Sequence, residues 1–576
     1  MKTGFTLLKG YKTTELASPP YGRFTTASDF NNARSTNSAT GDAFADFLLG
    51  YPSKTDVTIG DAGGFQKKTN WHLFLQDDWK VTPRLTLNLG LRYDNFGFFE
   101  DWQGRAAVGD FATGKIIIPD GSQSSIHPAY APFADRFIQA SEAGVPNTFI
   151  KPNNYDFAPR AGFAYRVRPD FVLRGGFGIY YVDYTVNEFR ESINVAPFVR
   201  RAQFSRSLLL SQNVDVNSIY TFLNPTANSN TAGADTQLTT LDGYNPEYPT
   251  QRSYTWNFTI EKELGAQLGL RTSYLGNTGR NLSRQVRVNA CVPGPTECLA
   301  RPASDPTARR WTQFGNGMGR RFGDGESNYN AWEIELQKRF TNGLLFDVNY
   351  AYARTFRLDP NASNPVADPT WRYDYGSVGA QPIHVFHWNY VWEIPFGKGR
   401  KFGSALHPAI QAVLGNWMFA GLGTWQAGQF LTITTSNGQS PTGAVTNRAD
   451  RIADGRIDQS GRSRGDKAAQ WFDTAAYRQP DFVNPAATRP TRQFGTAGPG
   501  TVLGPRFFTY DLQLQKTVPI RERYRLQFRA EVFNPFNIPM LGDPDTNVVS
   551  ANFGRIRTSN ANYTPRNVQF GARLDF

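Results

Sequence analysis

The stretch Trp332-Glu-Ile-Glu-Leu-Gln-Lys-Arg-Phe-Thr-Asn-Gly-Leu-Leu-Phe-Asp-Val-Asn-Tyr-Ala-Tyr352 decides the fold class. Apolar and polar residues alternate on both sides of Asn342-Gly343, and period two is typical of a β-strand with two different faces. Asn-Gly between alternating segments is the strongest short-range signal for a hairpin. One face is expected to carry Trp332, Ile334, Leu336, Phe346, Val348 and Tyr350, and the other Glu333, Glu335, Asp347 and Asn349.

The same unit of strand, short turn and strand recurs along the chain. Its copies are expected at 71–81/85–93, 157–167/171–181, 254–260/268–274, 332–340/344–352, 386–394/417–425 and 508–514/524–532, followed by one strand at the C-terminus. The turns contain Pro, Gly, Asn and Asp, as tight turns require. The pattern predicts an all-β, antiparallel, up-and-down sheet of about 13 or 14 strands, a number within the range of outer-membrane barrels.

Long polar connections separate the hairpins. They cover approximately 95–156, 184–251, 278–328, 355–383, 434–506 and 535–565, and are rich in Gly, Pro, Asn, Ser and Thr. Because the chain passes up and down, the short turns must share one rim of the sheet and the long loops the other. Short periplasmic turns with long extracellular loops are typical of transmembrane β-barrels. Soluble sandwiches share the strand alternation but not this asymmetry.

Composition supports a barrel whose interior is hydrated. A mean hydropathy of −0.47 and the lack of a long apolar run exclude a helical membrane protein. Aromatic residues make up 14% of the chain, as expected for a protein with aromatic rings at both membrane interfaces. The formal net charge of +12 is dispersed and predicts no nucleic-acid partner. The polar strand faces carry charges that suit a wide lumen: Arg92, Arg174, Arg271, Glu333, Glu335, Arg339, Arg525, Arg529, Glu531, Arg573 and Asp575.

Cys291 and Cys298, the only two cysteines, are the first and last residues of a Pro/Gly-rich octapeptide. This spacing favours a small disulfide loop in an extracellular connection and hence an oxidising compartment. Two unrelated free thiols are the alternative. Met1-Lys2-Thr3 is not followed by an apolar core, so no secretory signal peptide is recognisable.

The chain ends on an alternating strand with Val568, Phe570, Leu574 and Phe576 on one face. This strand resembles the C-terminal signature of bacterial outer-membrane proteins, which ends in an aromatic residue recognised by the barrel-assembly machinery. The resemblance implies that these four residues form an assembly signal.

Several longer segments resemble the barrel domain of TonB-dependent receptors, in particular the Oar-like branch. They are Phe44-Ala-Asp-Phe-Leu-Leu-Gly-Tyr-Pro52, Phe74–Tyr93, Ser273-Tyr-Leu-Gly-Asn277, Pro395-Phe-Gly-Lys-Gly399 and Leu526-Gln-Phe-Arg-Ala-Glu-Val-Phe-Asn-Pro-Phe-Asn537. The resemblance runs from about residue 40 to the end. It implies that residues 1–576 are one outer-membrane β-barrel domain, namely the C-terminal 14 or so strands of a barrel of about 22.

We therefore expect a partial barrel domain, without the N-terminal plug, regulatory domain and signal peptide of the family. TonB is an expected partner only if an upstream plug and TonB box exist. A partial sheet leaves two strand edges to be paired, so we also expect that this chain does not close into a functional transporter by itself.

No catalytic, cofactor or metal motif is recognisable in the sequence, and we expect no enzyme activity. His384 and His387 form the closest histidine pair, but residues three apart on a strand point to opposite faces. Asp450, Asp454 and Asp458 miss the spacing of a calcium loop and are interpreted as a solvated turn.

The sequence thus predicts a cell outer-membrane receptor or transporter barrel. Its expected partners are outer-membrane lipid, the barrel-assembly machinery and an unknown large solute, captured by the surface loops and a hydrated lumen. The alternative is a secreted soluble β-rich protein that binds or cleaves glycans, with aromatic loops as sugar platforms.

Overall fold

A single large antiparallel sheet forms most of the structure. The computed structural model describes residues 1–15, 23–25, 42–48, 54–59, 63–185, 189, 192–193, 195–205, 243–287, 289, 311, 319–358, 374–377, 381–435, 447–482, 492–520 and 524–576. Of the 17 strands in this sheet, three are two-residue additions, β6 (Glu100–Asp101), β13 (Gly243–Tyr244) and β18 (Tyr375–Gly376). The other strands are long and confirm the expected number of about 13 or 14.

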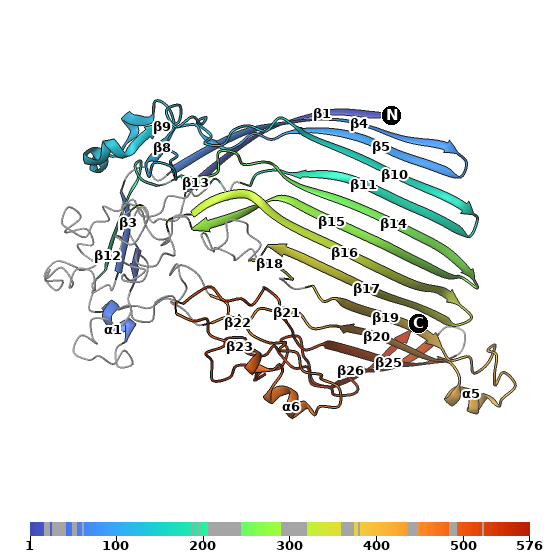
Figure 1. Cartoon of the computed structure of the whole chain (residues 1–576). Coiled ribbons are helices and arrows are strands. Elements are labelled where there is room, and N and C mark those ends of the chain that lie inside the picture. The colour runs from blue at the N-terminus through green and yellow to red at the C-terminus, as the bar shows by residue number, and fades with distance from the viewer. Residues whose placement is uncertain are drawn as a thin grey trace.

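The long strands pair mostly with their neighbours along the chain, as an up-and-down topology requires (Figure 1). In spatial order they are β1 (Lys2–Glu15), β4 (Gly63–Thr82), β5 (Leu85–Asn95), β10 (Asp156–Arg168), β11 (Phe171–Val182), β14 (Gln251–Gly265), β15 (Leu268–Arg287), β16 (Gly319–Thr341), β17 (Leu344–Leu358), β19 (His384–Glu393), β20 (Trp417–Gln426), β25 (Phe507–Ile520), β26 (Tyr524–Phe533) and β27 (Asn567–Asp575).

The smaller elements belong to the loops. They are the strands β2 (Arg23–Thr25), β3 (Lys54–Ile59) and β12 (Arg200–Ser205), the sheet of β7 (Val108–Gly109), β8 (Ile116–Ile118) and β9 (Phe137–Gln139), the pair β21 (Phe430–Leu431) and β24 (Val502–Leu503), the pair β22 (Asp450–Arg451) and β23 (Tyr477–Arg478), and the helices α1 (Ala43–Leu48), α5 (Pro408–Leu414) and α6 (Arg464–Ala469). Short 3₁₀ segments are η1 (Ser122–Ser125), η2 (Pro128–Arg136) and η6 (Thr474–Ala476). No helix in the described part of the chain is long and apolar enough to cross a membrane.

Short turns and long loops lie at opposite rims of the sheet, as predicted (Figure 1). The turn after Thr341 shows why the sequence folds this way. Asn342 and Gly343 both have positive φ, 53° and 77°, which a tight hairpin of the favoured hand requires at its two central residues. We call the two edges the short-turn rim and the long-loop rim.

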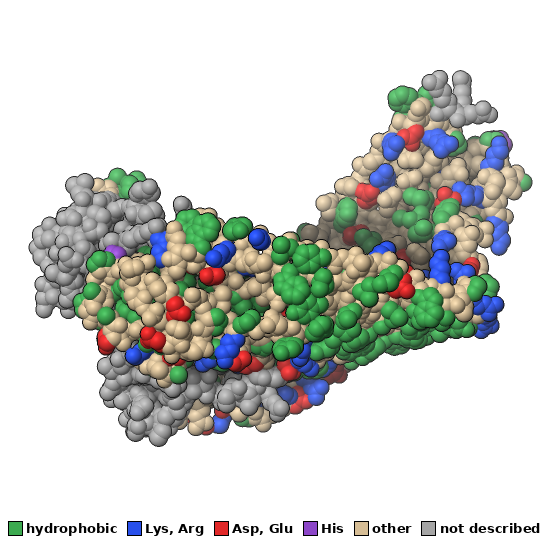
Figure 2. Space-filling model, turned by 90° about the horizontal axis from the view of Figure 1, so that it is seen from above, with side chains coloured by type: hydrophobic (Ala, Val, Ile, Leu, Met, Phe, Trp, Pro, Cys, Tyr) green, Lys and Arg blue, Asp and Glu red, His purple; other side chains and the backbone are tan. Residues whose placement is uncertain are grey.

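The two faces of the sheet also follow the predicted alternation. Trp332 lies opposite Tyr352, Ile334 opposite Tyr350 and Leu336 opposite Val348 on one face. Glu335 lies opposite Asn349 on the other face. Two hollows are found on the polar face, so it is the concave one, and we call it the inner face and the apolar one the outer face. In Figure 2 hydrophobic side chains are dense along one margin of the sheet, and the molecule is hollowed between the sheet's two ends.

This register makes a direct prediction for cysteine labelling in outer membranes. A water-borne, membrane-impermeant maleimide is expected to label Ile334→Cys about tenfold more slowly than Glu335→Cys, because only the inner face contacts water. Phe346→Cys and Asp347→Cys repeat the comparison on the partner strand. Equal labelling rates within both pairs would show that the faces are assigned wrongly.

One strand was missed, and one loop was predicted too long. The strand β1 was not identified from the sequence, because Leu7 and Leu8 are adjacent and break the alternation. Its position is given by its register with β4. The expected loop 278–328 is too long, since β15 continues to Arg287 and β16 begins at Gly319. A bidentate ion pair between Arg284 and Asp324 holds this extension together, with Nε–Oδ1 at 3.0 Å and Nη2–Oδ2 at 2.6 Å.

The sheet is open in the described part of the chain. There β1 has a ladder with β4 alone and β27 with β26 alone, and Figure 1 shows these two end strands far apart. Unpaired backbone groups are costly in hydrocarbon, so these two edges need partners in a membrane. The expectation that the chain does not close by itself stays a prediction.

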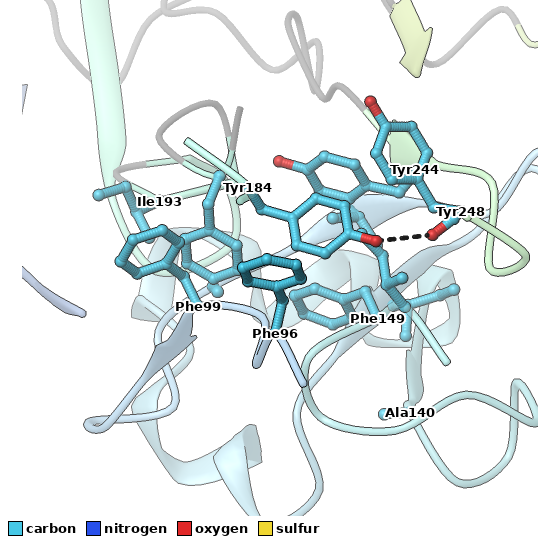
Figure 3. Packing of buried hydrophobic residues seen from close by; sticks show 13 residues of the cluster. Phe96, Phe99, Ala140, Phe149, Tyr184, Ile193, Tyr244 and Tyr248 are labelled. Carbon is cyan, nitrogen blue, oxygen red and sulfur yellow. Dashed lines mark hydrogen bonds between the residues drawn. The ribbon is translucent and has the colours of Figure 1, made fainter. Parts of the chain in front are cut away.

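Loops at one side of the long-loop rim fold into a compact body, which we call the N-terminal loop unit. It comprises two apolar clusters on either side of the small sheet β7–β8–β9, with Ile117 in one cluster and Ile116 and Ile118 in the other. The first cluster joins side chains from four separate segments, including Phe96, Phe149, Tyr184 and Tyr248 (Figure 3). These loops are therefore packed around apolar side chains, although the connections are rich in polar residues.

A second body, the C-terminal loop unit, covers the other end of the long-loop rim. Its core consists of Ile433, Ala449, Phe472, Ala476, Tyr477 and Val502, with Phe553 packed against it. The ring of Phe472 meets those of Tyr477 and Phe553 edge-on, with centroids 5.8 and 5.2 Å apart. A capping box between Ser463 and Asp466 stabilises the N-terminus of helix α6, and Ile556 N donates to Ala468 O at 2.8 Å.

Candidate functional site

Charged side chains of alternating sign cross the inner face on the side of the short-turn rim. Arg174 on β11, Glu261 on β14, Arg271 on β15 and Glu335 on β16 follow one another, and we call them the inner-face charge row. Glu261, Arg271 and Glu335 occupy one cross-strand register. Arg174 Nε lies 3.1 Å from Glu261 Oε2, and Arg271 donates a hydrogen bond to Glu335.

The charge row separates two hollows of the inner face, with volumes of about 740 and 750 Å³, and lines both of them. Around the second hollow the lining is mainly polar: Asn257, Thr259, Ser273, Tyr329, Glu333, Asn349, Gln381 and His387. Volumes of this size suit small-molecule ligands. Because several strands contribute donors and acceptors, this surface can bind a polar solute through many hydrogen bonds.

These charges contribute little to folding. Arg174 and Arg271 are more than half exposed, and exposed ion pairs stabilise a protein by about 0–1 kcal/mol. Their positions in a hydrated concavity instead leave them accessible to a passing solute. The strand register confirms that these side chains share one face of the sheet, and the wide, hydrated lumen stays a prediction.

A buried polar network connects the inner face to the N-terminal loop unit. Asp156, at the start of β10, accepts hydrogen bonds from Thr250 at 2.6 Å and Asn153 at 2.6 Å. The Tyr184 hydroxyl donates to Thr250 Oγ1 at 3.0 Å, and Tyr184 belongs to the apolar cluster of the loop unit. A change in the loops can therefore reach the sheet through a short chain of contacts.

The two histidines considered as a metal pair lie on opposite faces, as predicted. His384 Nδ1 is 2.8 Å from the hydroxyl of Tyr350 on the outer face. His387 Nδ1 is 2.9 Å from Thr424 Oγ1 on the inner face. Within the described ranges there is no group of three or more His, Cys, Asp or Glu that could hold a metal ion.

The three aspartates of the loop 450–458 have separate partners rather than a common centre. Asp454 accepts hydrogen bonds from Arg456, which lower the pKa of its carboxyl group. Asp458 accepts from Ser460, with the same effect on its pKa. Asp450 pairs with Arg478 at 3.7 Å. The arrangement is consistent with the solvated turn expected from the sequence.

The predicted disulfide between Cys291 and Cys298 lies outside the described residues and stays a prediction. We expect that alkylation of intact cells labels these thiols only after reduction, because a bridged pair has no reactive thiolate. Mass spectrometry of the peptide that contains both residues checks the result. Equal labelling before and after reduction would rule out the bridge.

Val568, Phe570 and Leu574 of the predicted C-terminal assembly signal share the outer face, and Phe576 follows the end of β27. Val568 lies opposite Val532, Phe570 opposite Ala530, and Leu574 opposite Leu526 on β26. Phe570 and Phe576 are 81% and 85% exposed, so the aromatic rings are free to contact lipid or protein. The residues thus form one apolar edge surface along β27, and only its C-terminal end lies at the short-turn rim.

The comparisons with known proteins agree with this architecture. A family model described as outer membrane beta barrel domain matches residues 1–569. The chain belongs to this family. As an outer-membrane β-barrel domain it resides in the cell outer membrane, and the match reaches further toward the N-terminus than residue 40, where the sequence resemblance began. No curated protein sequence matches the chain significantly.

Several solved structures resemble this outer-membrane β-barrel domain. The outer membrane transporter YddB from Escherichia coli is 11% identical with a TM-score of 0.39, and the match covers 91% of this chain and 49% of that one. The FrpB iron transporter from Neisseria meningitidis is 10% identical with a TM-score of 0.38, covering 100% and 52%. The ferric enterobactin receptor PfeA from Pseudomonas aeruginosa is 10% identical with a TM-score of 0.39, covering 91% and 50%. The chain spans about half the length of these proteins, and none of the comparisons supports the alternative of a secreted glycan-binding protein.

Proposed function

We propose that this domain is the barrel of an outer-membrane receptor or transporter, without enzyme activity, that captures a large polar solute. The observation that carries the proposal is the inner-face charge row between two polar hollows, below loops folded into compact units. If the inner face had only a structural role, it would not require accessible charges in register across β14, β15 and β16. The resemblance to TonB-dependent receptors supports the same function.

The solute is expected to contact the loop units first and the inner face second. The resembling structures include an iron transporter and a ferric enterobactin receptor, so a ferric chelate is one solute class to test. Active import requires TonB together with a plug and TonB box, which the family carries upstream of the barrel. The apolar edge formed by Val568, Phe570, Leu574 and Phe576 is the proposed contact for the barrel-assembly machinery.

Exchange of charges within the row tests the proposal. Cells with and without the gene are incubated with labelled ferric chelates, oligosaccharides and peptides, and surface capture is measured. For a captured solute, Arg271→Gln is expected to lower the affinity about tenfold or more, because a charge-assisted hydrogen bond is lost. The matched control, Arg271→Glu combined with Glu335→Arg, keeps the ion pair and the barrel but moves the positive charge by one strand.

The outcomes separate a binding role from a structural one. If the double variant folds normally and also loses capture, the solute is recognised by a positive charge at position 271. If neither variant changes capture of any probe that the wild-type cells retain, the inner face is not part of the binding surface. Recovery of the chain in the soluble secreted fraction, not in outer membranes, would contradict the assignment as a membrane receptor.

A further inference from the structure

The connection between β19 and β20 is the most elaborate feature of the described short-turn rim. Residues 394–416 turn back on themselves, with Gly397 N donating to Phe402 O at 2.9 Å and Phe402 N to Pro395 O at 3.0 Å. Gly397 and Gly399 have φ of 121° and 74°, which explains the glycines of the Pro-Phe-Gly-Lys-Gly segment. The connection continues into helix α5, which projects beyond the sheet (Figure 1).

Helix α5 is amphipathic despite its short length. Ile410, Val413 and Leu414 are spaced i, i+3 and i+4, so they share one face of the helix, and all three are largely exposed. Gln411 lies off this face and its side chain donates to Ser404 O and Leu406 O, both at 3.0 Å. The polar contacts therefore fix the helix to its own loop and leave its apolar face without cover from the described residues.

Two outer-face residues attach α5 to the apolar side of the sheet. Trp417 Nε1 donates to Val413 O at 2.9 Å, and Lys516 Nζ donates to Val413 O at 3.2 Å and also to Gly415 O. Trp417 and Lys516 are cross-strand partners on the same face as Phe419 and Leu514. Carbonyl groups at the helix end thus accept hydrogen bonds from a buried lysine on the outer face, and its cation lies at the C-terminal, negative end of the helix dipole.

The apolar face of α5 consequently continues the lipid-facing surface of β19, β20 and β25 beyond the end of the strands. At the same rim Trp392 and Tyr524 are exposed on the outer face, as in the aromatic belt at a membrane interface. Lys398 and Lys401 are exposed in the preceding turn, while Arg400 pairs with Glu393 at 2.6 Å. Apolar side chains with nearby lysines match the acyl and phosphate layers of a phospholipid leaflet.

We propose that the β19–β20 connection is an interfacial anchor: α5 lies in the phospholipid leaflet at the short-turn rim, with Ile410, Val413 and Leu414 among the acyl chains and Lys398 and Lys401 at the phosphates. Continuity with the outer face argues for lipid as the occupant. Interfacial helices with such a face lie in the plane of the boundary and do not span the bilayer.

Spin labels on single cysteines test the anchor in outer membranes that contain the full chain. In a background with Cys291→Ser and Cys298→Ser, a nitroxide is attached to Val413→Cys, Ala412→Cys or Leu514→Cys. Collision rates are measured with oxygen, which concentrates in lipid, and with a water-soluble nickel chelate. Leu514 is the lipid control on the outer face, and the exposed Ala412 is the water control on the opposite side of α5.

The label at 413 is expected to resemble that at 514, with an oxygen-to-nickel collision ratio severalfold higher than at 412. Values at 413 equal to those at 412 would overturn the proposal. A label at 413 that is shielded from both reagents would also overturn it, because a protein partner and not lipid would then cover α5. Water exposure at both 413 and 514 would overturn it together with the membrane register of the sheet.

Charge reversal tests the phosphate contact separately. Lys398→Glu with Lys401→Glu is expected to lower the oxygen-to-nickel collision ratio at 413 severalfold while leaving the ratio at 514 unchanged. Lysines attract the lipid phosphates, whereas glutamates repel them. An unchanged ratio at 413 would show that the two lysines do not contribute to the anchor. Equal heat-modifiable migration of the variants shows that the sheet itself is intact.

Discussion

Asp374→Ala is expected to open the C-terminal loop unit while the large sheet stays folded. Arg448 Nη1 lies 2.8 Å from Asp374 Oδ1, and the two side chains are only 8% and 9% exposed. The substitution removes the carboxylate that pairs with this buried guanidinium, and breaking a buried ion pair typically costs about 3–5 kcal/mol. Asp374 lies beside β18 and Arg448 beside the core residue Ala449, so this pair connects two loops that are distant in sequence.

Limited proteolysis of intact cells measures the opening. Where opening and closing are fast, cleavage follows the population of the open form, so a loss of this size increases cleavage within 447–482 about a hundredfold or more. The matched control is Asp481→Ala, which breaks the exposed pair with Arg478, 3.1 Å apart, and is expected to cost at most about 1 kcal/mol.

A double variant distinguishes the charge from the packing. Asp374→Leu with Arg448→Met removes both charges and keeps apolar volume, and such replacements are often neutral or stabilising. It is expected to restore most of the protease resistance. If Asp374→Ala and Asp481→Ala are cleaved at the same rate, the buried pair does not hold the loops together.

The hairpins were predictable because the information for them is local. Alternation of period two and two turn residues are enough to place Trp332–Tyr352, and neither depends on a distant part of the chain. A strand whose alternation is interrupted needs its neighbour: β1 is recognisable only in register with β4, where Phe5 pairs with Leu73 and Leu7 with Trp71. The sequence pattern does not identify such a strand, because a single pair of adjacent leucines interrupts the alternation between its two faces.

The loop units were not predictable because their cores come from distant segments. In the N-terminal loop unit Phe96 follows β5, Phe149 precedes β10, Tyr184 follows β11 and Tyr248 precedes β14. Each segment is polar on average, and the apolar residues in it are too few to give a period. One signal was present, the run Ile116-Ile117-Ile118 inside an otherwise polar connection. A short continuous apolar run between turns is typical of a strand buried on both faces.

The inner-face charge row was predictable only in part. The alternation predicted that Arg271 and Glu335 share the polar side of the sheet, but not that they are neighbours. Their contact depends on the stagger between β15 and β16, where Thr278 to Leu268 pairs with Asn328 to Lys338 without interruption. The register of a long hairpin with a distant turn therefore decides which charges meet, and the sequence contains no short-range signal for it.

Ile116→Ala is expected to unfold much of the N-terminal loop unit and with it the capture of solute. Ile116 is completely buried in the middle strand of β7–β8–β9 and packs in the cluster that includes Phe111, Phe198 and Trp311. Truncation of a buried isoleucine to alanine costs about 2–5 kcal/mol, because the lost transfer energy adds to that of the cavity. Since the small sheet separates two clusters, the defect also loosens the side that holds Ile117.

A graded series at this position gives the measurement its control. Ile116→Val is expected to cost about 0.5–1.5 kcal/mol, and Lys115→Ala, at the exposed neighbouring position, close to nothing. Hydrogen exchange of 106–150 reports the loop unit, and exchange of β14 to β17 reports the sheet. We expect graded loss of protection in the first region and none in the second, because the membrane strands are held by their own ladders. If the alanine variant lost protection equally in both regions, the loop unit would be part of the same cooperative structure as the sheet, and a loss of capture could not be assigned to the loops alone.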